Sequence, residues 1–209
     1  MNEADNIPHV FQKIPPIIDE IVVVDSSSDN TVAIVRKYAP HARIIITEPK
    51  GKGNALKIGF QNATGDVIIM LDADGSMDPG ELPLFIEPLL DGHDVVQGSR
   101  ILGGSDDLTL FRRFGNFFFV SLVNRMFDCN YTDLCYGYRG FKKIVIDQID
   151  FDSDGFDVET ELTIKTRKNG FRICEVPSYE RNRIHGQSNL RTFRDGWKIL
   201  YRIFKEWSN

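Results

Sequence analysis

The sequence predicts an α/β protein built on a doubly wound, mainly parallel sheet. Short runs rich in Ile and Val alternate with longer segments whose apolar residues recur at helical spacing. The apolar runs are continuous rather than alternating, which is typical of strands that helices cover on both faces. In sheets of this class, ligands bind beyond the carboxyl ends of the strands.

Strands and helices are expected in alternating order along the 209 residues. The expected strands are 20–25, 42–47, 66–72, 94–99 and 171–177. The expected helices are 31–38, 54–62, 79–90, 112–127, 158–169 and 190–207. Since the first and third strands end in Asp25 and Asp72, both carboxylates are expected at the ligand-binding edge. The phenylalanines of helix 112–127 are expected in the core, with a ligand cage as the alternative.

Charge is distributed unevenly along the chain. The formal net charge is −5, but residues 161–209 hold 11 Lys and Arg against 5 Asp and Glu, whereas residues 1–160 hold 14 against 25. An acidic body with a basic C-terminal quarter argues against a general nucleic-acid-binding protein. It suits an anionic ligand or a membrane surface.

Cysteine usage and hydropathy predict the compartment. Cys129, Cys135 and Cys174 lack metal-ligand spacing, and their odd number gives no disulfide framework. No apolar run approaches the roughly 20 residues that span a bilayer. We therefore expect a cytoplasmic protein, with peripheral contact to the cytoplasmic face of a membrane left open.

Asp72 and Asp74 directly follow an apolar strand at a spacing of two, which places both side chains on one side of an extended chain. Two such carboxylates repel each other unless a cation lies between them. Mg²⁺ or Mn²⁺, with diphosphate oxygens completing its shell, fits this pattern. The alternative is an acidic turn that caps the helix beginning near Pro79.

Four basic residues are candidate phosphate ligands. Lys52 lies between glycines just before a helix, where backbone amides also bind phosphate, although the loop lacks Walker A spacing. Arg100 follows a strand end, and Arg112 and Arg113 follow a segment rich in Gly, Ser and Asp. The alternatives are an ordinary glycine-containing loop and solvated surface arginines.

Two later segments carry further candidates. A Gly-, Ser- and Asn-containing loop holds Arg183 and His185 and is suited to closing over a diphosphate; a structural histidine is the alternative. Asp157 and Glu159 stand at the start of a helix. Acidic residues are favoured there by the helix dipole alone, so a role as general base stays open beside a capping role.

The C-terminal segment is expected to form a basic amphipathic helix. Its aromatic and aliphatic residues recur at helical spacing, with Arg and Lys on the other faces. The apolar positions are Phe193, Trp197, Leu200, Phe204 and Trp207. Such a helix lies on an anionic membrane or packs on the domain.

Taken together, these motifs resemble those of family 2 glycosyltransferases of the GT-A fold. Within that family, they are similar to the dolichyl- or polyprenyl-phosphate mannose or glucose synthases. The resemblance lies in "VVVDSSSDNT", "KGKGNALKIGF", "LDADGSMDP", "TDLCYGYRGF", "GFDVETEL" and "RIHGQSNL", which run in family order over nearly the whole chain. It implies a catalytic domain over 1–189, with the helix at 190–209 belonging to it or contacting the membrane.

The resemblance implies an inverting, metal-dependent transfer of glucose or mannose from a UDP- or GDP-sugar to a phosphate-bearing acceptor. Polyprenyl or dolichyl phosphate is the favoured acceptor. Such an acceptor is already ionised near neutral pH and needs no general base. If the acceptor were a hydroxyl, Asp157 or Glu159 would have to take its proton.

On the donor side, the resemblance implies that Asp25 contacts the nucleotide base and that Glu3 ends the first nucleotide-binding motif. Asp74 is similar to the direct metal ligand of the D-x-D pair, assisted by Asp72, with Mg²⁺ or Mn²⁺ as cofactor. Ser76 occupies the position where some lipid-phosphate mannosyltransferases have a metal-binding Gln.

Further roles follow for the phosphates. Lys52 is assigned to the nucleotide sugar. The loop that folds over the donor diphosphate holds Arg183, His185 and Ser188. The arginines that hold the acceptor phosphate are Arg100 and Arg112, with Arg113 beside them.

One departure concerns the start of the sheet. The family begins with a strand that ends in Pro before Asn-Glu, whereas here Met1 stands directly before Asn2 and Glu3. We therefore expect the first strand to be missing, through truncation, a misassigned start or replacement by a partner strand. Transfer to a soluble acceptor, a nucleotidyltransferase, and a truncated, non-catalytic nucleotide-sugar-binding domain remain alternative interpretations.

Overall fold

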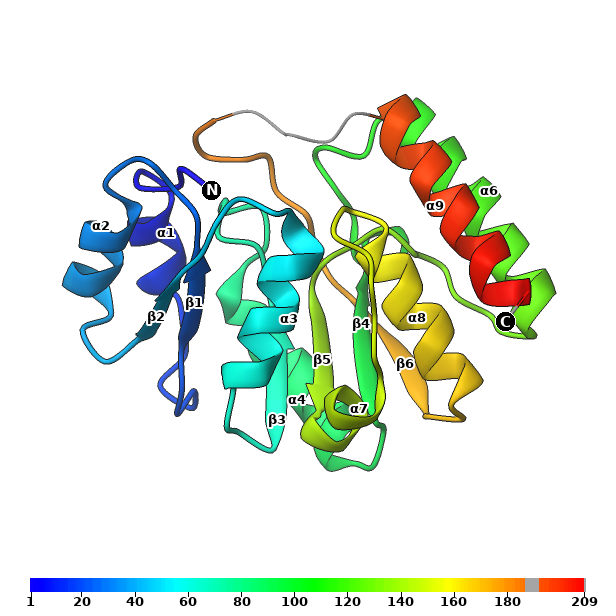
Figure 1. The fold of residues 1–209 in the computed structure, drawn as a ribbon, viewed down its shortest axis with the longest axis horizontal. Coiled ribbons are helices and arrows are strands. Elements are labelled where there is room, and N and C mark those ends of the chain that lie inside the picture. Colours follow the sequence, from blue (N-terminus) through cyan, green and yellow to red (C-terminus); the bar gives the residue numbers. More distant parts are fainter. Residues whose placement is uncertain (187–191, 209) are drawn as a thin grey trace.

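The computed structural model describes residues 1–186 and 192–208, and in it helices cover both faces of a twisted sheet (Figure 1). The strands are β1 (Val22–Asp25), β2 (Arg43–Ile46), β3 (Val67–Met70), β4 (Val95–Ser99), β5 (Arg139–Lys142) and β6 (Ile173–Pro177). The longer helices are α2 (Thr31–Tyr38), α3 (Lys52–Asn62), α4 (Leu82–Leu90), α6 (Leu110–Phe127), α8 (Val158–Lys168) and α9 (Thr192–Ser208). The shorter ones are α1 (Ile7–Phe11), η1 (Pro79–Glu81), α5 (Arg100–Gly103) and α7 (Lys143–Gln148).

All the predicted strands and helices are present, with small shifts at their ends. The prediction missed the short elements α1, α5, α7 and β5. Each of these spans only four to six residues, too few for a hydrophobic period to show. None of the helices in the described part of the chain is long and apolar enough to cross a membrane.

The sheet is mainly parallel, as predicted, with one additional strand, β5, that runs in the opposite direction. β1 pairs with β2 in parallel, and β4 pairs with β6 in parallel. β5 lies between β3 and β4 and runs antiparallel to both, in the order β3-β5-β4-β6. Among the described residues, no pairing joins β1 or β2 to the other four strands. β5 escaped detection because its sequence, "RGFK", contains two cations and a glycine in place of an apolar run.

The core fills both faces of the four-stranded sheet. On one face Phe60 of α3 and Leu162 of α8 pack with Phe141. On the other face Phe85 of α4 stacks on Tyr138, with ring centroids 4.1 Å apart. Gly140 permits this packing, because a Cβ there would lie 2.7 Å from Ile69 and 3.0 Å from Leu89.

Helices α6 and α9 form a pair at one end of the molecule, beside α8 (Figure 1). They pack through Val120, Val123, Ile199 and Ile203. The prediction that the phenylalanines of helix 112–127 lie in the core is wrong for the exposed Phe114, Phe117 and Phe118. The apolar residues of α6 spread around the helix, and the smaller valines occupy the buried side.

Arg139 on β5 is fully buried and holds three parts of the chain together. Its guanidinium donates to the backbone carbonyls of Leu134 (3.0 Å) and Tyr136 (3.1 Å) and to that of Glu159 on α8 (2.9 Å). It also donates to Thr163 Oγ1 at 2.6 Å. Because burial disfavours the charged form, it lowers the pKa of Arg139. The guanidinium therefore fixes the loop before β5 and the first turn of α8 relative to each other.

We expect Arg139→Leu to lower the free energy of unfolding by about 3 kcal/mol or more, because three buried carbonyls each lose a charged donor. Urea unfolding followed by circular dichroism measures the change. Arg43→Leu is the matched control: Arg43 donates to the carbonyl of Asn62, but its side chain is about half exposed. An Arg139 variant no less stable than the Arg43 variant would contradict this account.

Candidate active site

A cavity of about 580 Å³ opens at the carboxyl ends of β3 and β4, between the loop that follows β6 and the helices α6, α8 and α9. This is the sheet edge at which the sequence predicted a ligand site. The predicted residues that line it are Lys52, Asp72, Asp74, Ser76, Arg100, Arg112, Glu159 and Arg183. Residues from six separate parts of the chain therefore meet in one place.

Asp74 is buried, and both of its carboxylate oxygens are engaged. Oδ1 accepts from the backbone N (3.0 Å) and Oγ (2.7 Å) of Ser76, which forms a tight turn around the carboxylate. Oδ2 lies 2.7 Å from Nη2 of Arg183. The turn fixes the orientation of Asp74, and Arg183 balances its charge.

Lys52 joins Asp72 to Glu159. Its Nζ lies 2.8 Å from Oδ2 of Asp72 and 2.7 Å from Oε1 of Glu159. Burial alone would lower the pKa of Lys52, but the two carboxylates outweigh burial and raise it. Gly137 makes room for the ammonium group, because a Cβ at that position would lie 2.7 Å from Nζ.

Glu159 lines the cavity, and one of its carboxylate oxygens has no partner in the described chain. Its side chain is nearly fully buried at the start of α8, and Oε1 is held by Lys52. Oε2 accepts no hydrogen bond from any described residue. Because Oε2 is itself buried, the established role of this carboxylate is to hold Lys52 at the cavity wall.

The N-terminal segment contacts the loop that carries Arg183. Arg183 Nη1 lies 3.4 Å from Oε1 of Glu3, while Asn6 Nδ2 donates to Oε2 of Glu3 at 2.5 Å. Asn6 also exchanges two hydrogen bonds with the backbone of His185. Glu3 and His185 thus hold the 180–186 loop near Asp74 without lining the cavity. Asp25, bound by Ser27 Oγ at 2.5 Å, lies outside the lining as well.

The predicted phosphate-binding arginines differ in their surroundings. Arg100 is largely buried and forms a bidentate pair with Asp133, at 2.7 and 2.9 Å, and a further contact with Glu180 at 3.3 Å. Burial would lower its pKa, but these carboxylates raise it. Arg112 is half-exposed and contacts Asp107 at the cavity wall. Arg113 is exposed and is not part of the lining.

Asp157 belongs to a structural network rather than to the cavity wall. Its Oδ2 accepts from Ser153 Oγ at 2.7 Å and lies 3.4 Å from Nε of Arg202. Of the two candidate bases, only Glu159 lines the cavity. Ser188, predicted for the donor loop, lies outside the described residues.

The sequence analysis missed the residues that position the site. Asp133 fixes Arg100, and Gly137 makes room for Lys52. Both lie within the segment "TDLCYGYRGF", in which no single residue type had drawn attention. Cys135 also lines the cavity, but burial raises the pKa of its thiol to about 12, so the thiol stays protonated.

The oxygen ligands needed for Mg²⁺ or Mn²⁺ are present only in part. Within the described residues, no three His, Cys, Asp or Glu side chains cluster so as to hold a metal by themselves. Asp72, Asp74 and the Ser76 hydroxyl supply hard oxygen atoms of the kind these ions prefer. A diphosphate would have to complete the shell, so this set fits an ion that binds together with a phosphate ligand.

Comparison with known proteins identifies the family. The family model described as glycosyl transferase family 2 matches residues 1–150. The chain belongs to this family. The cavity is therefore the candidate active site of a family 2 glycosyltransferase, and its fold is of the GT-A type, as predicted.

Two similar proteins come from archaea. This glycosyltransferase is 32% identical over 207 residues to the dolichyl-phosphate hexose transferase of Haloferax volcanii, covering 98% of this chain and 89% of that protein. It is 28% identical over 220 residues to the dolichol-phosphate mannosyltransferase of Pyrococcus furiosus. That match covers 98% of this chain but only 61% of the Pyrococcus protein.

A solved structure supports the fold. Glucosyl-3-phosphoglycerate synthase from Mycobacterium tuberculosis, in complex with Mn²⁺, UDP and glucosyl-3-phosphoglycerate, superimposes with a TM-score of 0.77 at 20% identity. The match covers all of this chain and 77% of that one. The similarity establishes the shared architecture.

We expect Lys52→Met to lower the free energy of unfolding by about 3 kcal/mol, since it leaves the buried Glu159 without its cation. The pKa of Lys52 is raised in the folded state. The stability that Lys52 contributes to the fold is therefore complete when the pH is below its ordinary pKa of 10.5, and it is lost as the pH rises through the higher pKa of the folded state. The stability difference from the wild type should therefore stay constant across neutral pH and narrow only in strong alkali.

Urea unfolding at several pH values tests this prediction. Lys50→Met is the matched control, because Lys50 is exposed and pairs only with the exposed Glu48 in the described structure. Equal stability of the Lys52 and Lys50 variants would refute the proposed role of the Asp72–Lys52–Glu159 cluster.

Proposed function

We propose that this family 2 glycosyltransferase moves a hexose, glucose or mannose, from a UDP- or GDP-sugar to polyprenyl phosphate, with inversion at the anomeric carbon. One observation carries the proposal: a single cavity combines the Asp72–Asp74 pair and five cationic side chains with a wall of apolar aromatic residues. The aromatic part of the wall consists of Phe111, Phe118, Phe119, Phe156, Phe193 and Trp197. The similar archaeal proteins are named for transfer to or from dolichyl phosphate.

The charged part of the cavity suits the donor. Asp74, with Asp72 and Ser76, would hold Mg²⁺ or Mn²⁺ against the donor diphosphate. A bound ion would neutralise the charge that develops on the leaving nucleoside diphosphate. Lys52 and Arg183 already lie beside the two carboxylates and add positive charge where the diphosphate would sit. Structural relatives hold Mn²⁺ or Mg²⁺ together with UDP, which supports this assignment.

The acceptor side relies on Arg112. Its guanidinium is half-exposed, reaches the cavity wall and is bound within the described chain only at Asp107. Arg100 is held by Asp133 and Glu180, so we assign it to shaping the wall and to adding positive potential. Arg113 does not line the cavity, so we assign direct contact with the acceptor phosphate to Arg112 rather than to Arg113.

The transfer then proceeds as a single displacement. An oxygen of the acceptor phosphate attacks the anomeric carbon from the face opposite the diphosphate. The carbon–oxygen bond to the diphosphate breaks, and its electron pair leaves with the nucleoside diphosphate. The ionised acceptor needs no base, so Glu159 is left as the carboxylate that holds Lys52 in place.

Transfer to a soluble phosphate-bearing acceptor is the second candidate. A structural relative binds glucosyl-3-phosphoglycerate, a small anionic product. The aromatic wall of the cavity favours the lipid, because a small charged acceptor gains little from contact with Phe and Trp side chains.

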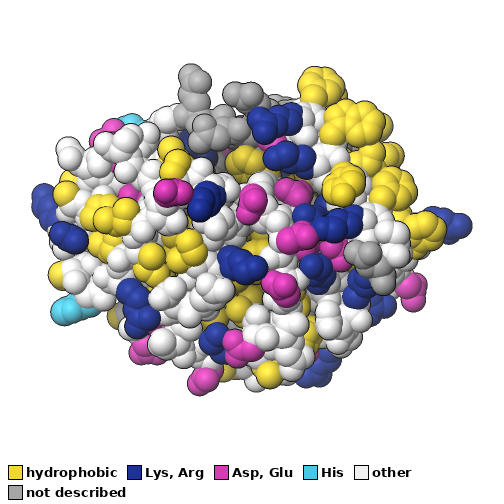
Figure 2. Space-filling model, in the orientation of Figure 1, with side chains coloured by type: hydrophobic (Ala, Val, Ile, Leu, Met, Phe, Trp, Pro, Cys, Tyr) yellow, Lys and Arg dark blue, Asp and Glu magenta, His cyan; other side chains and the backbone are white. Residues whose placement is uncertain are grey.

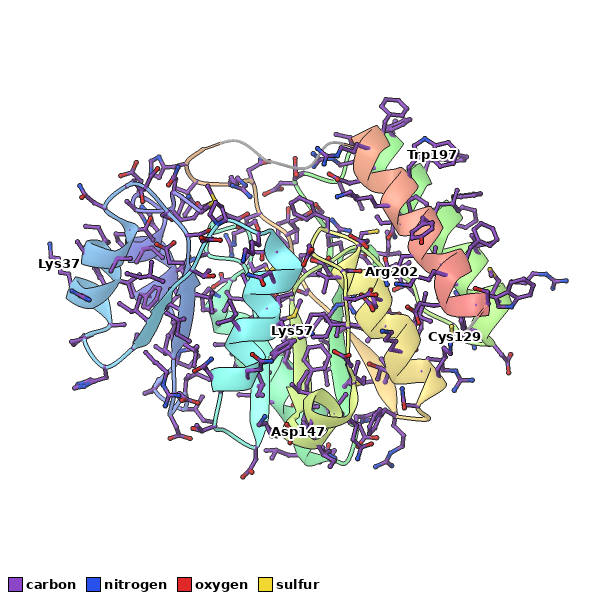
Figure 3. The ribbon with its side chains drawn as sticks, viewed as in Figure 1. Lys37, Lys57, Cys129, Asp147, Trp197 and Arg202 are labelled. Atoms are coloured by element: carbon purple, nitrogen blue, oxygen red, sulfur yellow. The ribbon has the colours of Figure 1, made fainter. Side chains whose placement is uncertain are left out.

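We expect Asp74→Asn to reduce sugar transfer by about 100-fold or more, because the amide is a poor metal ligand and cannot neutralise a cation. The fold should persist, since Asn retains an oxygen that can accept from Ser76. Asp147→Asn on the remote helix α7 is the control (Figure 3). Near-normal turnover by the Asp74 variant would contradict the proposed role of Asp74 in metal binding.

The assay compares UDP- and GDP-linked glucose and mannose, with Mg²⁺ or Mn²⁺, with and without polyprenyl phosphate. Lipid-dependent release of UDP or GDP supports the proposal and identifies the nucleotide. Release in the presence of soluble phosphate esters alone supports the second candidate. If calorimetry shows metal-dependent nucleotide binding but no acceptor gives transfer, the chain acts as a binding domain.

A further inference from the structure

The C-terminal helix α9 turns its aromatic face away from the protein. Phe193, Trp197, Tyr201, Phe204 and Trp207 recur at helical spacing and are all exposed. Trp197 is 71% exposed and lies on the outer side of the helix (Figure 3). A helix of a globular domain normally buries such a stripe.

Buried charges fix this orientation. Arg202, on the inner side of α9, contacts Asp152, Asp157 and Glu161 and lies 3.5 Å from Glu206 of its own helix. Asp195 and Glu206 of α9 are buried as well. Rotating α9 to bury its aromatic face would break these ion pairs and leave buried charged groups without partners. The packing of α9 therefore requires its aromatic side chains to face outward.

Helix α6 extends the same surface. Leu110, Phe111, Phe114, Phe117 and Phe118 are exposed along it. The rings of Phe111 and Phe193 lie 5.7 Å apart and connect the two stripes. Together these ten residues form what we call the α6–α9 face, seen as the hydrophobic band at the upper right in Figure 2. Apart from Tyr38 and Tyr179, every exposed aromatic side chain of the described residues belongs to it.

The exposed charges on these two helices are all basic, although the whole chain carries a net charge of −5. The exposed basic residues are Arg113, Arg125, Arg194 and Lys198. α6 contains no acidic residue, and both acidic residues of α9 are buried. Aromatic side chains flanked by exposed cations match the interface of an anionic bilayer, which offers acyl chains beside negative head groups.

The α6–α9 face is continuous with the active-site cavity. Phe111, Phe118, Phe193 and Trp197 belong to both surfaces. A lipid phosphate could therefore pass from the bilayer to Arg112 without its chain crossing water. A second copy of the chain fits less well, because a two-fold dimer through this face would bring like charges together.

We propose that the α6–α9 face docks onto anionic membrane and presents the cavity to the bilayer surface. Docking itself depends only on this face. The delivery of a lipid acceptor to the cavity rests on the function proposed above.

Flotation with phospholipid vesicles that contain neither acceptor nor donor tests docking directly. Wild-type protein should float with phosphatidylcholine vesicles in proportion to the phosphatidylglycerol they contain, and less so as salt rises. A triple variant, Phe114→Ser, Phe117→Ser and Phe204→Ser, should bind about ten-fold more weakly. These three residues are exposed and lie outside the cavity lining.

The matched control replaces three exposed residues elsewhere, Leu84→Ser, Leu90→Ser and Ile144→Ser on α4 and α7, and should bind like the wild type. Docking is refuted if wild-type protein floats with no vesicle composition, or if the α6–α9 variant floats as well as the control. A wild-type dimer that the α6–α9 variant converts to a monomer, without vesicle binding, would also refute it and assign the face to a second copy.

A transfer assay then separates docking from catalysis. With polyprenyl phosphate in anionic vesicles, the α6–α9 variant should transfer about ten-fold more slowly than the control variant, while a short, water-soluble isoprenyl phosphate should be used equally by both. Equal rates with the vesicle acceptor would refute delivery through this face. If no isoprenyl phosphate is used but vesicle binding persists, the proposed function fails and docking stands.

Discussion

The buried guanidinium of Arg139 is the constraint on which the arrangement of this site depends. It lies on the short antiparallel strand at the centre of the sheet and donates to carbonyls on both sides. One side is the loop that carries Gly137, and the other is the first turn of α8, which carries Glu159. A buried cation without a carboxylate directly on it persists only if its donors are satisfied, so the surrounding backbone has little freedom to move. The position of Glu159 in the cavity follows from that rigidity.

The cavity itself is organised by neutralisation of charge. Asp72 and Glu159 share Lys52, and Asp74 is paired with Arg183. The two carboxylates that could bind a metal ion are thus each paired with a cation that could bind a phosphate. Such an arrangement limits the cost of burying the charges and keeps their orientation before a ligand arrives, as electrostatic preorganisation requires. Arg183 also connects Asp74 to Glu3, so the loop after β6 and the N-terminal segment meet over the same carboxylate.

The same principle explains the surface at the other end of the cavity. Arg202 of α9 pairs with Glu161 of α8 and with Asp152 and Asp157 before that helix, and these pairs keep the Arg202 side of α9 inward. The aromatic side must then face outward and continues onto α6. The buried ion pairs of α9 and its exposed aromatic face are therefore two consequences of one packing arrangement, and the active-site cavity opens beside this face.

The sequence by itself determined the order and type of the main elements, because continuous Ile and Val runs and helical periodicity are local signals. It also placed Asp72, Asp74, Lys52 and Arg183 together, because carboxyl ends of strands and the loops beside them gather at one sheet edge. The reversed strand β5 was decided by tertiary packing, since four residues with two cations carry no local strand signal. Tertiary structure likewise decided that Arg100 is held by Asp133, that Glu159 rather than Asp157 reaches the cavity, and that the phenylalanines of α6 face outward. In each case the outcome depends on which distant charge or apolar surface a side chain contacts. The spacing of residues along the chain does not indicate that partner.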